Sequence, residues 1–374
     1  MTTLTLDPTV AEFAPAMTAW RRDFHAHPEL SGEESRTGGV VLAILRGLGL
    51  KAEGGVGGAG VVAVVEDMDA LPLPDESGVA YASKTHNVSH ACGHDGHTAS
   101  LLGVARWLAA NPPARGRVVL IFQPAEENGL GAEAMIRDGL FERWPCDEVY
   151  AYHNMPLLPF GEASVRPGPT LNGYRIWDIE VQGVGGHGAA PHRAVDPLQA
   201  AARIASDLGS VVGRHIDPME PALLTVTKLQ AGSNHNVIPQ SASLAGTLRS
   251  TSPEVIDELW RRLEAICAGV ALSTGCTVTP RIAAGVPPCV NAPEQAEVAA
   301  QACEAVLGVG KVRRDLKPYP FTDDFAYMLQ AAPGAYLFLG QGGEMVHRPA
   351  YDFNDELLPV AVSVFLQILE RRLA

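Results

Sequence analysis

The spacing of apolar residues changes several times along the first part of the chain, and each change predicts a different element. Helices are predicted where apolar residues recur at helical spacing, over residues 9–22, 34–48, 97–110 and 131–138. Short continuous runs of β-forming residues predict strands over residues 61–65, 117–122 and 148–152. The run at 117–122 is apolar enough to be buried on both faces. Alternating strands and helices predict an open α/β sheet, which binds ligands at the carboxyl ends of its strands.

The pattern changes after Pro167-Gly168-Pro169. Half-buried strands are predicted over residues 175–182, 222–229 and 241–248, and helices near 196–213 and 254–272. The chain returns to the first pattern near Val286-Pro287-Pro288, with a helix at 294–307, a strand at 335–339 and a helix at 356–372. This order predicts a domain of residues 1–172 and 287–374, with a small α+β domain of residues 173–286 inserted into it.

Composition and charge narrow the class of protein. The chain has 374 residues, which is too long for one ordinary core, and its 47% hydrophobic and 19% charged residues are typical of a globular protein. No apolar run reaches the roughly 18–20 residues that span a bilayer, and the N-terminus does not resemble a signal peptide, so we expect a cytoplasmic protein without a membrane partner. The net charge of -14 disfavours non-specific binding to nucleic acid.

Six scattered cysteines form no CxxC pair, so the sequence suggests neither a zinc knuckle nor a disulfide scaffold. Cys92 differs from the others because His94 follows it by two residues. A thiolate and an imidazole at this spacing can reach one metal ion or two adjacent ions. Taken alone, the pair is more often a buried cysteine beside a surface histidine.

Three further groups of polar residues stand where apolar strands are predicted to end. Glu126 and Glu127 follow the strand at 117–122, and their side chains point in different directions, so that one can bind metal while the other acts as a general base. A solvated acidic turn is the simpler interpretation, but the preceding strand is too apolar for the surface. His153 ends the next strand, and His347 follows the last one. With Cys92 and His94, this set suffices for two divalent ions sharing one ligand.

The inserted domain carries a second cluster. His187 ends the glycine-rich turn GVGGH, Asn236 precedes Val-Ile-Pro, and Arg249 ends a predicted strand. An arginine can bind a carboxylate through two hydrogen bonds. On these residues alone, an ordinary turn and a surface arginine are the better interpretation.

A series of longer motifs resembles the M20 metallopeptidase family, and specifically its amidohydrolase and aminoacylase branch. The motifs, in family order, are RRDFHAHPEL, DMDALP, HACGHDGHTA, IFQPAEENG, GAEAMIRDGLF, YHNMP, GGHGAAPH, NVIP, GTLR, DDFAYML and VHRPAYDFND. The resemblance extends from about Arg21 to Arg372 and is specific as a joint pattern. It implies a zinc-exopeptidase-like α/β catalytic domain with an inserted α+β lid and dimerisation domain, assembled as a homodimer or homotetramer.

The resemblance also implies two divalent metal ions per subunit, of zinc, manganese, cobalt or nickel. Carried over by position, the metal ligands are Cys92, His94, Glu127, His153 and His347, with Cys92 bridging the ions. Asp67 and Asp69 of DMDALP fall near the metal site, where they would contact the metal ligands and not bind the ions themselves.

The same resemblance implies hydrolysis of the amide bond in hippurate-like or N-acetyl-amino acids, giving a carboxylic acid and a free amino acid. A dipeptidase or carboxypeptidase of the same family is the nearest alternative. Glu126 falls on the general base and His187 on a lid histidine that helps to stabilise the oxyanion. Asn236 and Arg249 fall on substrate-binding residues, and Arg249 would hold the substrate carboxylate.

Two departures from the family pattern keep other interpretations open. The segment before DMDALP lacks the usual hairpin and Arg-Ala pair, so that Val65-Glu66 leads directly into Asp67, and a strand is missing or one strand serves for two. Asp323-Asp324 stands where Glu-Asp is usual. The shortened segment motivates a non-catalytic, metal-binding member as an alternative. A cysteine hydrolase using Cys92 is another, but it has no need of Glu126, Glu127 or His347.

Overall fold

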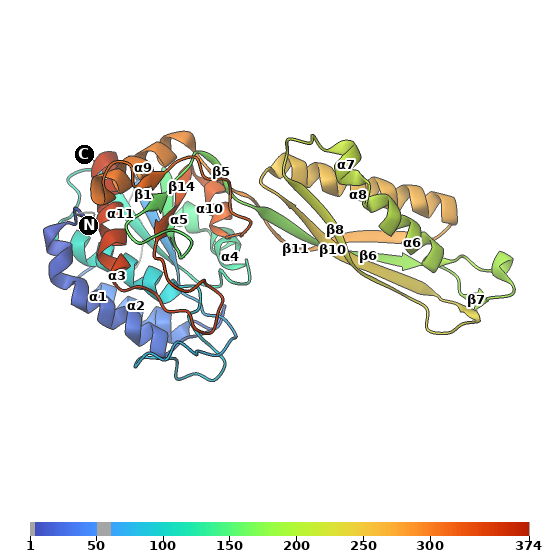
Figure 1. The fold of residues 1–374 in the computed structure, drawn as a ribbon, viewed down its shortest axis with the longest axis horizontal. Coiled ribbons are helices and arrows are strands. Elements are labelled where there is room, and N and C mark those ends of the chain that lie inside the picture. The colour runs from blue at the N-terminus through green and yellow to red at the C-terminus, as the bar shows by residue number, and fades with distance from the viewer. Residues whose placement is uncertain (1–3, 51–60, 374) are drawn as a thin grey trace. The chain divides into compact units, whose positions relative to one another are not determined.

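The chain forms two compact units in the computed structural model, which describes residues 4–50 and 61–373. The first unit comprises Met1–Thr170, Val290–Lys317 and Asp323–Ala374, and the second comprises Leu171–Cys289 and Pro318–Thr322. Figure 1 shows the elements of both units in chain order by colour. Among the residues described, none of the helices has both the length and the apolar character that crossing a membrane requires.

The first unit has an α/β architecture. Its helices are α1 (Pro8–Ala26), α2 (Ser35–Gly47), α3 (His94–Ala110), α4 (Gly131–Arg137), α5 (Leu140–Arg143), α9 (Pro293–Leu307), α10 (Phe325–Ala331) and α11 (Leu357–Leu373). Its main strands are β1 (Val61–Asp67), β2 (Arg117–Gln123), β3 (Glu148–Met155), β4 (Ala163–Ser164), β13 (Val312–Arg313) and β14 (Gly334–Gly340). A two-stranded sheet of β5 (Gly168–Leu171) and β12 (Cys289–Asn291) lies where the chain leaves this unit and returns to it.

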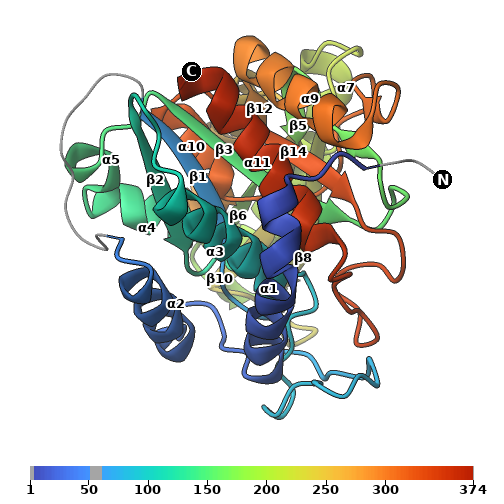
Figure 2. The same cartoon turned by 90° about the vertical axis from the view of Figure 1, so that its left-hand side faces the viewer.

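The six strands form one sheet in the order β13-β4-β14-β3-β1-β2. The four strands from β14 to β2 are parallel, and β4 is antiparallel to β14. Nearly every side chain of β3 and β14 is buried, as expected for central strands with both faces covered. Figure 2 shows α1, α3, α9 and α11 gathered over one face of this sheet, where their apolar residues form the largest core cluster.

Several predictions about the burial and the bounds of the elements need correction. The strand predicted at 117–122 is not buried on both faces, because β2 is the last strand of the sheet in the described residues and only Ile121 and Gln123 are buried. The helix predicted from residue 97 begins at His94, and the one predicted over 196–213 is two helices separated by Gly209 and Ser210. The strand at Thr277–Val286, β11, and helix α10 were not predicted.

The segment before DMDALP is a single strand. β1 runs straight into Asp67 between β2 and β3, with Asp67 opposite Gln123. One strand therefore occupies this central position, and the described residues contain no further strand beyond β2. Residues 51–60, which precede β1, lie outside the described part of the chain.

The second unit is an antiparallel sheet covered by helices. Its elements are β6 (Gly173–Gln182), β7 (Gly186–His187), η1 (Pro191–Arg193), α6 (Pro197–Leu208), α7 (Val211–His215), β8 (Ala222–Ala231), β9 (Val237–Ile238), β10 (Ser241–Ser250), α8 (Pro253–Thr274) and β11 (Thr277–Val286). The sheet order is β11-β6-β10-β8, and Figure 1 shows α6 and α8 over the same face. Trp177, Ile204 and Leu263 lie in the core between helices and sheet. That this unit acts as a lid or dimer contact stays a prediction.

Candidate metal centre

The predicted ligands meet at the carboxyl ends of the parallel strands. The donor atoms of Cys92, His94 and His153 lie within 4.8 Å of one another, and so do those of Cys92, Glu127 and His347. Cys92 belongs to both groups. The structure thus brings five residues from four separate parts of the first unit to one place, in two groups that share the thiol. Two adjacent cations with one common ligand would fit this arrangement.

Hydrogen bonds fix which ring nitrogen of each buried histidine faces the centre. His153 Nδ1 lies 2.7 Å from the Asn154 carbonyl oxygen, which leaves its Nε2 facing Cys92 Sγ at 3.3 Å. His94 Nδ1 lies 3.0 Å from the carbonyl oxygen and 3.2 Å from Oδ1 of Asp69, which leaves its Nε2 free. In both rings the nitrogen that is not hydrogen-bonded to backbone or carboxylate points to the shared centre, as metal-binding histidines require.

Two of these donor atoms are buried with nothing to bind. His94 Nε2 and Glu127 Oε1 have no hydrogen-bond partner, although both are shielded from solvent. Buried polar atoms without partners are rare, because each costs the free energy of its lost hydration. The other oxygen of Glu127, Oε2, lies 3.4 Å from His347 Nε2. The unpartnered atoms face the two groups of donors, so the residues present fit divalent cations. A set of one thiol, three imidazoles and a carboxylate suits zinc or a similar transition metal.

The electrostatics of the centre also favour cations. Burial, together with the charges of Asp323, Glu127 and Asp67, raises the pKa of Glu126 well above its usual range. Burial and the neighbouring Asp323 raise the pKa of Asp324 to about 8. Carboxylates crowded in this way repel one another, and bound divalent ions would relieve that repulsion.

Glu126 lies at the side of this centre. Its Oε2 is 3.9 Å from His94 Nε2, and its side chain is 12% exposed, so it is neither fully buried nor free in solvent. The Glu126 carboxyl also lies within 4.8 Å of the carboxyls of Asp323 and Asp324. Asp323 accepts a hydrogen bond from Tyr336 Oη, and Asp324 accepts one from Gln123 Nε2. Glu126 therefore has access to both the donor cluster and solvent, which a group that moves protons to and from a substrate needs.

Asp67 and Asp69 differ in their surroundings. Asp69 connects two of the clustered residues, because its Oδ1 faces His94 and its Oδ2 accepts the Glu127 backbone N–H at 3.0 Å. Hydrogen bonds from His94 and Ser31 outweigh the effect of burial and lower the pKa of Asp69 to about 2. Burial and Asp323 instead raise the pKa of Asp67 well above its usual range.

His187, Asn236 and Arg249 belong to the second unit. His187 lies on β7, where its exposed ring accepts the Ala189 N–H through Nδ1 at 3.0 Å. The exposed Asn236 precedes β9, the partner strand of β7, and its carbonyl oxygen accepts the Gly188 N–H at 2.8 Å. Arg249 lies on β10 with its guanidinium 5.4 Å from the centre of the Tyr174 ring. The structure thus brings His187, on β7, close to Asn236, which directly precedes the paired strand β9.

A buried charged network behind the donor cluster was not predicted. Asp95, the neighbour of His94, accepts from His25 Nδ1 at 2.8 Å and lies 3.4 Å from Arg21. His25 Nε2 lies 3.2 Å from Asp75. Burial alone would lower the pKa of His25, but its hydrogen bonds to Asp75 and Asp95 raise it to about 9. The only sequence signal was the motif RRDFHAHPEL, whose residues gave no indication of their partners.

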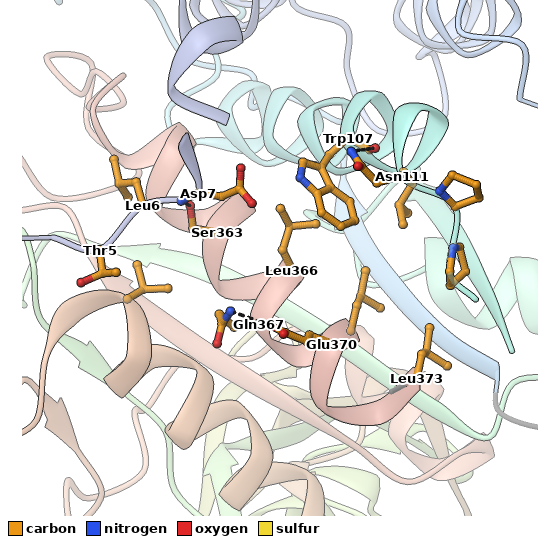
Figure 3. A pocket seen from close by; sticks show the side chains of 15 residues that line it. Thr5, Leu6, Asp7, Trp107, Asn111, Ser363, Leu366, Gln367, Glu370 and Leu373 are labelled. Carbon is orange, nitrogen blue, oxygen red and sulfur yellow. Dashed lines mark hydrogen bonds between the residues drawn. The ribbon is translucent and has the colours of Figure 1, made fainter. Parts of the chain in front are cut away.

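An apolar cavity of about 520 Å³ lies elsewhere in the first unit, between α3, α11 and the segment before α1. Figure 3 shows Trp107 and Leu366 among its lining residues. Its polar groups bond to one another, since Gln367 Nε2 donates to Glu370 and Asn111 Nδ2 donates to the Trp107 carbonyl oxygen. The cavity contains none of the predicted site residues and offers a ligand few free polar contacts.

Comparison with known proteins gives one family. The model of peptidase family M20/M25/M40 matches residues 63–371. The hippurate hydrolase of Campylobacter jejuni is 33% identical over 378 residues, which cover 98% of each chain. An N-acetyl-L-cysteine deacetylase of Bacillus subtilis is 34% identical over 370 residues, covering 94% of this chain and 87% of the relative.

A solved structure agrees with these relatives. It is a protein of Bacillus subtilis described as a dinuclear metal binding peptidase from the M20 family. It matches with a TM-score of 0.81 and 28% sequence identity, covering 97% of this chain and 99% of that one. The match extends over both units of the chain, so both the metal-binding architecture and the inserted unit have a counterpart of known structure.

Proposed function

The chain belongs to peptidase family M20/M25/M40, and from this premise we propose that it hydrolyses the amide bond of N-acyl amino acids. The products are a carboxylic acid and a free amino acid. The observation that carries the proposal is the cluster of five donor residues around Cys92, with Glu126 beside it. Relatives named as a hippurate hydrolase and an N-acetyl-L-cysteine deacetylase support N-acyl amino acids as the substrate class.

Two divalent ions would be held by the five clustered residues. Cys92 would be shared, with His94 and His153 on one side and Glu127 and His347 on the other. When bound, such ions polarise the amide carbonyl and make water a stronger nucleophile near neutral pH. The thiol, imidazole and carboxylate donors support zinc, manganese, cobalt or nickel as the metal.

Glu126 is the general base and then the general acid of the proposed reaction. It takes a proton from the attacking water and delivers that proton to the leaving nitrogen, so the carboxyl ends the cycle as it began. Its buried surroundings support this role, because they raise the pKa of the carboxyl and make the protonated form accessible. Asp69 holds His94 and the Glu127 backbone in place during both steps.

The second unit supplies the remaining groups in this proposal. Arg249 holds the substrate carboxylate, for which its planar guanidinium is suited. Asn236 contributes a further polar contact, and His187 stabilises the oxyanion through Nε2, since its Nδ1 already accepts the Ala189 N–H. Together these residues would select substrates with a free carboxylate next to the amide bond.

The thiol alternative is less well supported. A cysteine hydrolase needs a readily formed thiolate, which requires a lowered pKa. Burial and the charge of Glu127 instead raise the pKa of the Cys92 thiol well above its usual range. A cation at this position would favour the thiolate, which is consistent with Cys92 as a ligand rather than a nucleophile.

We also propose that the chain assembles through the second unit as a homodimer or homotetramer. The support is β8, which is the last strand of its sheet and exposes Leu223 and Leu229. Light scattering at working concentration tests this assembly, and a single monomeric species would contradict it.

A panel of N-acetyl-, N-benzoyl- and dipeptide substrates tests the proposed activity. The wild type should release free amino acid from N-acyl substrates, and Glu126→Gln should lose this turnover while keeping its metal. Glu356→Gln changes an exposed glutamate of the same unit and should retain full activity. Faster cleavage of dipeptides would favour the peptidase alternative. A folded, metal-loaded wild type without turnover on any substrate would favour a non-catalytic member.

A further inference from the structure

We infer that Glu34 is a positioning residue for the reaction, which fixes the backbone conformation that aims Glu126 at the donor cluster. This inference rests on the proposed function in so far as it concerns turnover. Oε1 of Glu34 accepts the backbone N–H of Ala125 at 2.8 Å, although the two residues are 91 positions apart in the sequence. Ala125 directly precedes Glu126.

Ala125 has a backbone conformation that alanine rarely adopts. Its φ is +58°, in the left-handed region, and the residue is buried. For an L-amino acid with a Cβ this region is unfavourable, so neighbouring contacts must maintain it. Only two other non-glycine residues of the described chain, Asn87 and His347, have a positive φ. One of them is itself a predicted ligand.

The turn that contains Ala125 cannot easily relax. The Ala125 carbonyl oxygen accepts the Gly131 N–H at 3.1 Å, and the Glu126 carbonyl oxygen accepts the Gly129 N–H at 2.7 Å. A Cβ at Gly131 would lie only 1.6 Å from the Pro124 carbonyl oxygen. The direction of the Glu126 side chain therefore depends on a closely packed turn whose first residue is strained.

Two carboxylates from outside the turn hold the backbone on either side of Glu126. Glu34 accepts the Ala125 N–H, and Asp69 accepts the Glu127 N–H at 3.0 Å. Asp69 Oδ2 in turn accepts Ser31 Oγ–H at 2.6 Å. The short loop between α1 and α2 thus supplies both supports, one directly through Glu34 and one through Ser31.

The same loop shows why Glu34 is available for this contact. Glu34 stands at the N-cap of α2, a position whose side chain usually binds the first backbone N–H groups of its own helix. Here that task falls to Glu29, whose two oxygens accept the N–H groups of Arg36 at 2.9 Å and Thr37 at 2.7 Å. Glu34 makes no cap bond and reaches Ala125 instead.

Removal of the carboxylate should impair chemistry more than binding. In Glu34→Ala, Ala125 loses the contact that maintains its φ, and we expect kcat to fall about 10- to 100-fold with little change in KM and in metal content. Glu34→Gln keeps an acceptor oxygen and should lie between this variant and the wild type. Glu33→Ala, at the exposed neighbouring glutamate, is the matched control and should leave kcat unchanged.

The substitution Ala125→Gly tests whether Glu34 acts by positioning residue 125 or only by stabilising the fold. Glycine adopts a positive φ readily, so the double variant Glu34→Ala/Ala125→Gly should regain most of the lost kcat. Urea unfolding of the four members of this cycle gives a readout that is independent of turnover. The two substitutions should be non-additive, with Glu34→Ala less destabilising when residue 125 is glycine.

The outcomes are distinguishable. An unchanged kcat in Glu34→Ala, or an equal loss with and without Ala125→Gly, would overturn the inference and leave Glu34 as a structural residue. Additive effects on unfolding would also overturn it. A wild type that binds metal but turns over no substrate, while the unfolding cycle is non-additive, would instead overturn the proposed function and leave the link between Glu34 and Ala125 standing.

Discussion

His94 directs Nδ1 toward the Asp69 carboxylate, 3.2 Å away, and its Nε2 is consequently left buried without a partner at the centre of the donor cluster. The same carboxylate accepts the Glu127 backbone N–H through its other oxygen. One side chain therefore orients two predicted metal ligands from different parts of the chain. This relationship connects DMDALP with both HACGHDG and QPAEENG, and it explains how these distant motifs act together.

Asp69→Asn should weaken metal binding. The two contacts use the two oxygens of the carboxylate, whereas asparagine has one acceptor oxygen and one NH2 donor, so His94 or the Glu127 N–H loses its acceptor. We expect about 10- to 100-fold lower metal affinity, as is usual when a partner of a ligating histidine is changed. Competition with a chromogenic chelator measures this affinity. Asp315→Asn, at an exposed aspartate of the same unit, should match the wild type, and equal affinities for all three proteins would contradict this role of Asp69.

Gly131→Ala should damage the turn that carries Glu126. The added Cβ would lie 1.6 Å from the Pro124 carbonyl oxygen, so the backbone must move. We expect a lower melting temperature together with a large loss of kcat. Gly38→Ala provides the control, because a Cβ there meets nothing within 4 Å and glycine weakens a helix interior by about 1 kcal/mol relative to alanine. Wild-type activity in Gly131→Ala would show that the turn tolerates displacement.

The network around His25 should make stability depend on pH. The pKa of His25 is about 9 in the folded chain against 6.5 for an unperturbed histidine, so the folded state binds the proton more tightly. This contribution is fully present below pH 6.5 and is lost as the pH rises through about 9. It amounts to about 3 kcal/mol, from a shift of some 2.5 units.

Urea unfolding of the wild type and His25→Gln over this pH range checks the prediction. The difference in their free energies of unfolding should shrink as the pH rises. His86→Gln, at an exposed histidine of the first unit, should follow the wild type at every pH. A difference that stays constant from pH 6 to pH 9.5, or that grows, would exclude a protonated His25 in the folded state.

Arg249→Lys should raise KM. The predicted contact with the substrate carboxylate needs a planar group with two parallel N–H donors, which lysine lacks. We expect KM to rise about tenfold with a smaller effect on kcat, and steady-state kinetics with an N-acetyl amino acid measures both. Arg281→Lys changes an exposed arginine of the same sheet and should leave KM unchanged. The same KM for both variants would remove Arg249 from the substrate site.

Much of the fold was accessible from the sequence because local patterns determine it. The run at 335–339 is apolar throughout and the run at 148–152 is apolar after Glu148, and they form the buried central strands β14 and β3. The prediction that the run at 117–122 is buried on both faces was wrong, because composition does not show whether a neighbouring strand covers a run. In the structure β2 lies at the edge of the described sheet. Helix α10 was missed because its residues, FAYMLQA, are nearly all apolar and show no helical alternation of apolar and polar positions.

The candidate site was predictable only in part, for a similar reason. Cys92, His94 and Glu127 lie in compact motifs, and their gathering follows from the parallel strand order. The contacts that orient them join residues far apart in sequence, such as Glu34 with Ala125, and no local pattern reports such pairs. The left-handed φ of Ala125 was equally hidden, since alanine gives no sign of it.

The dependence of turnover on metal is the most direct test of the proposed hydrolase. The protein is stripped with a chelator, its metal content is counted, and release of amino acid from an N-acyl substrate is measured before and after zinc or manganese is returned. We predict loss of turnover in the stripped protein and recovery as two ions bind per chain, with no recovery in His94→Ala. Undiminished turnover by the metal-free protein, abolished by alkylation of Cys92, would contradict this account and favour a cysteine hydrolase.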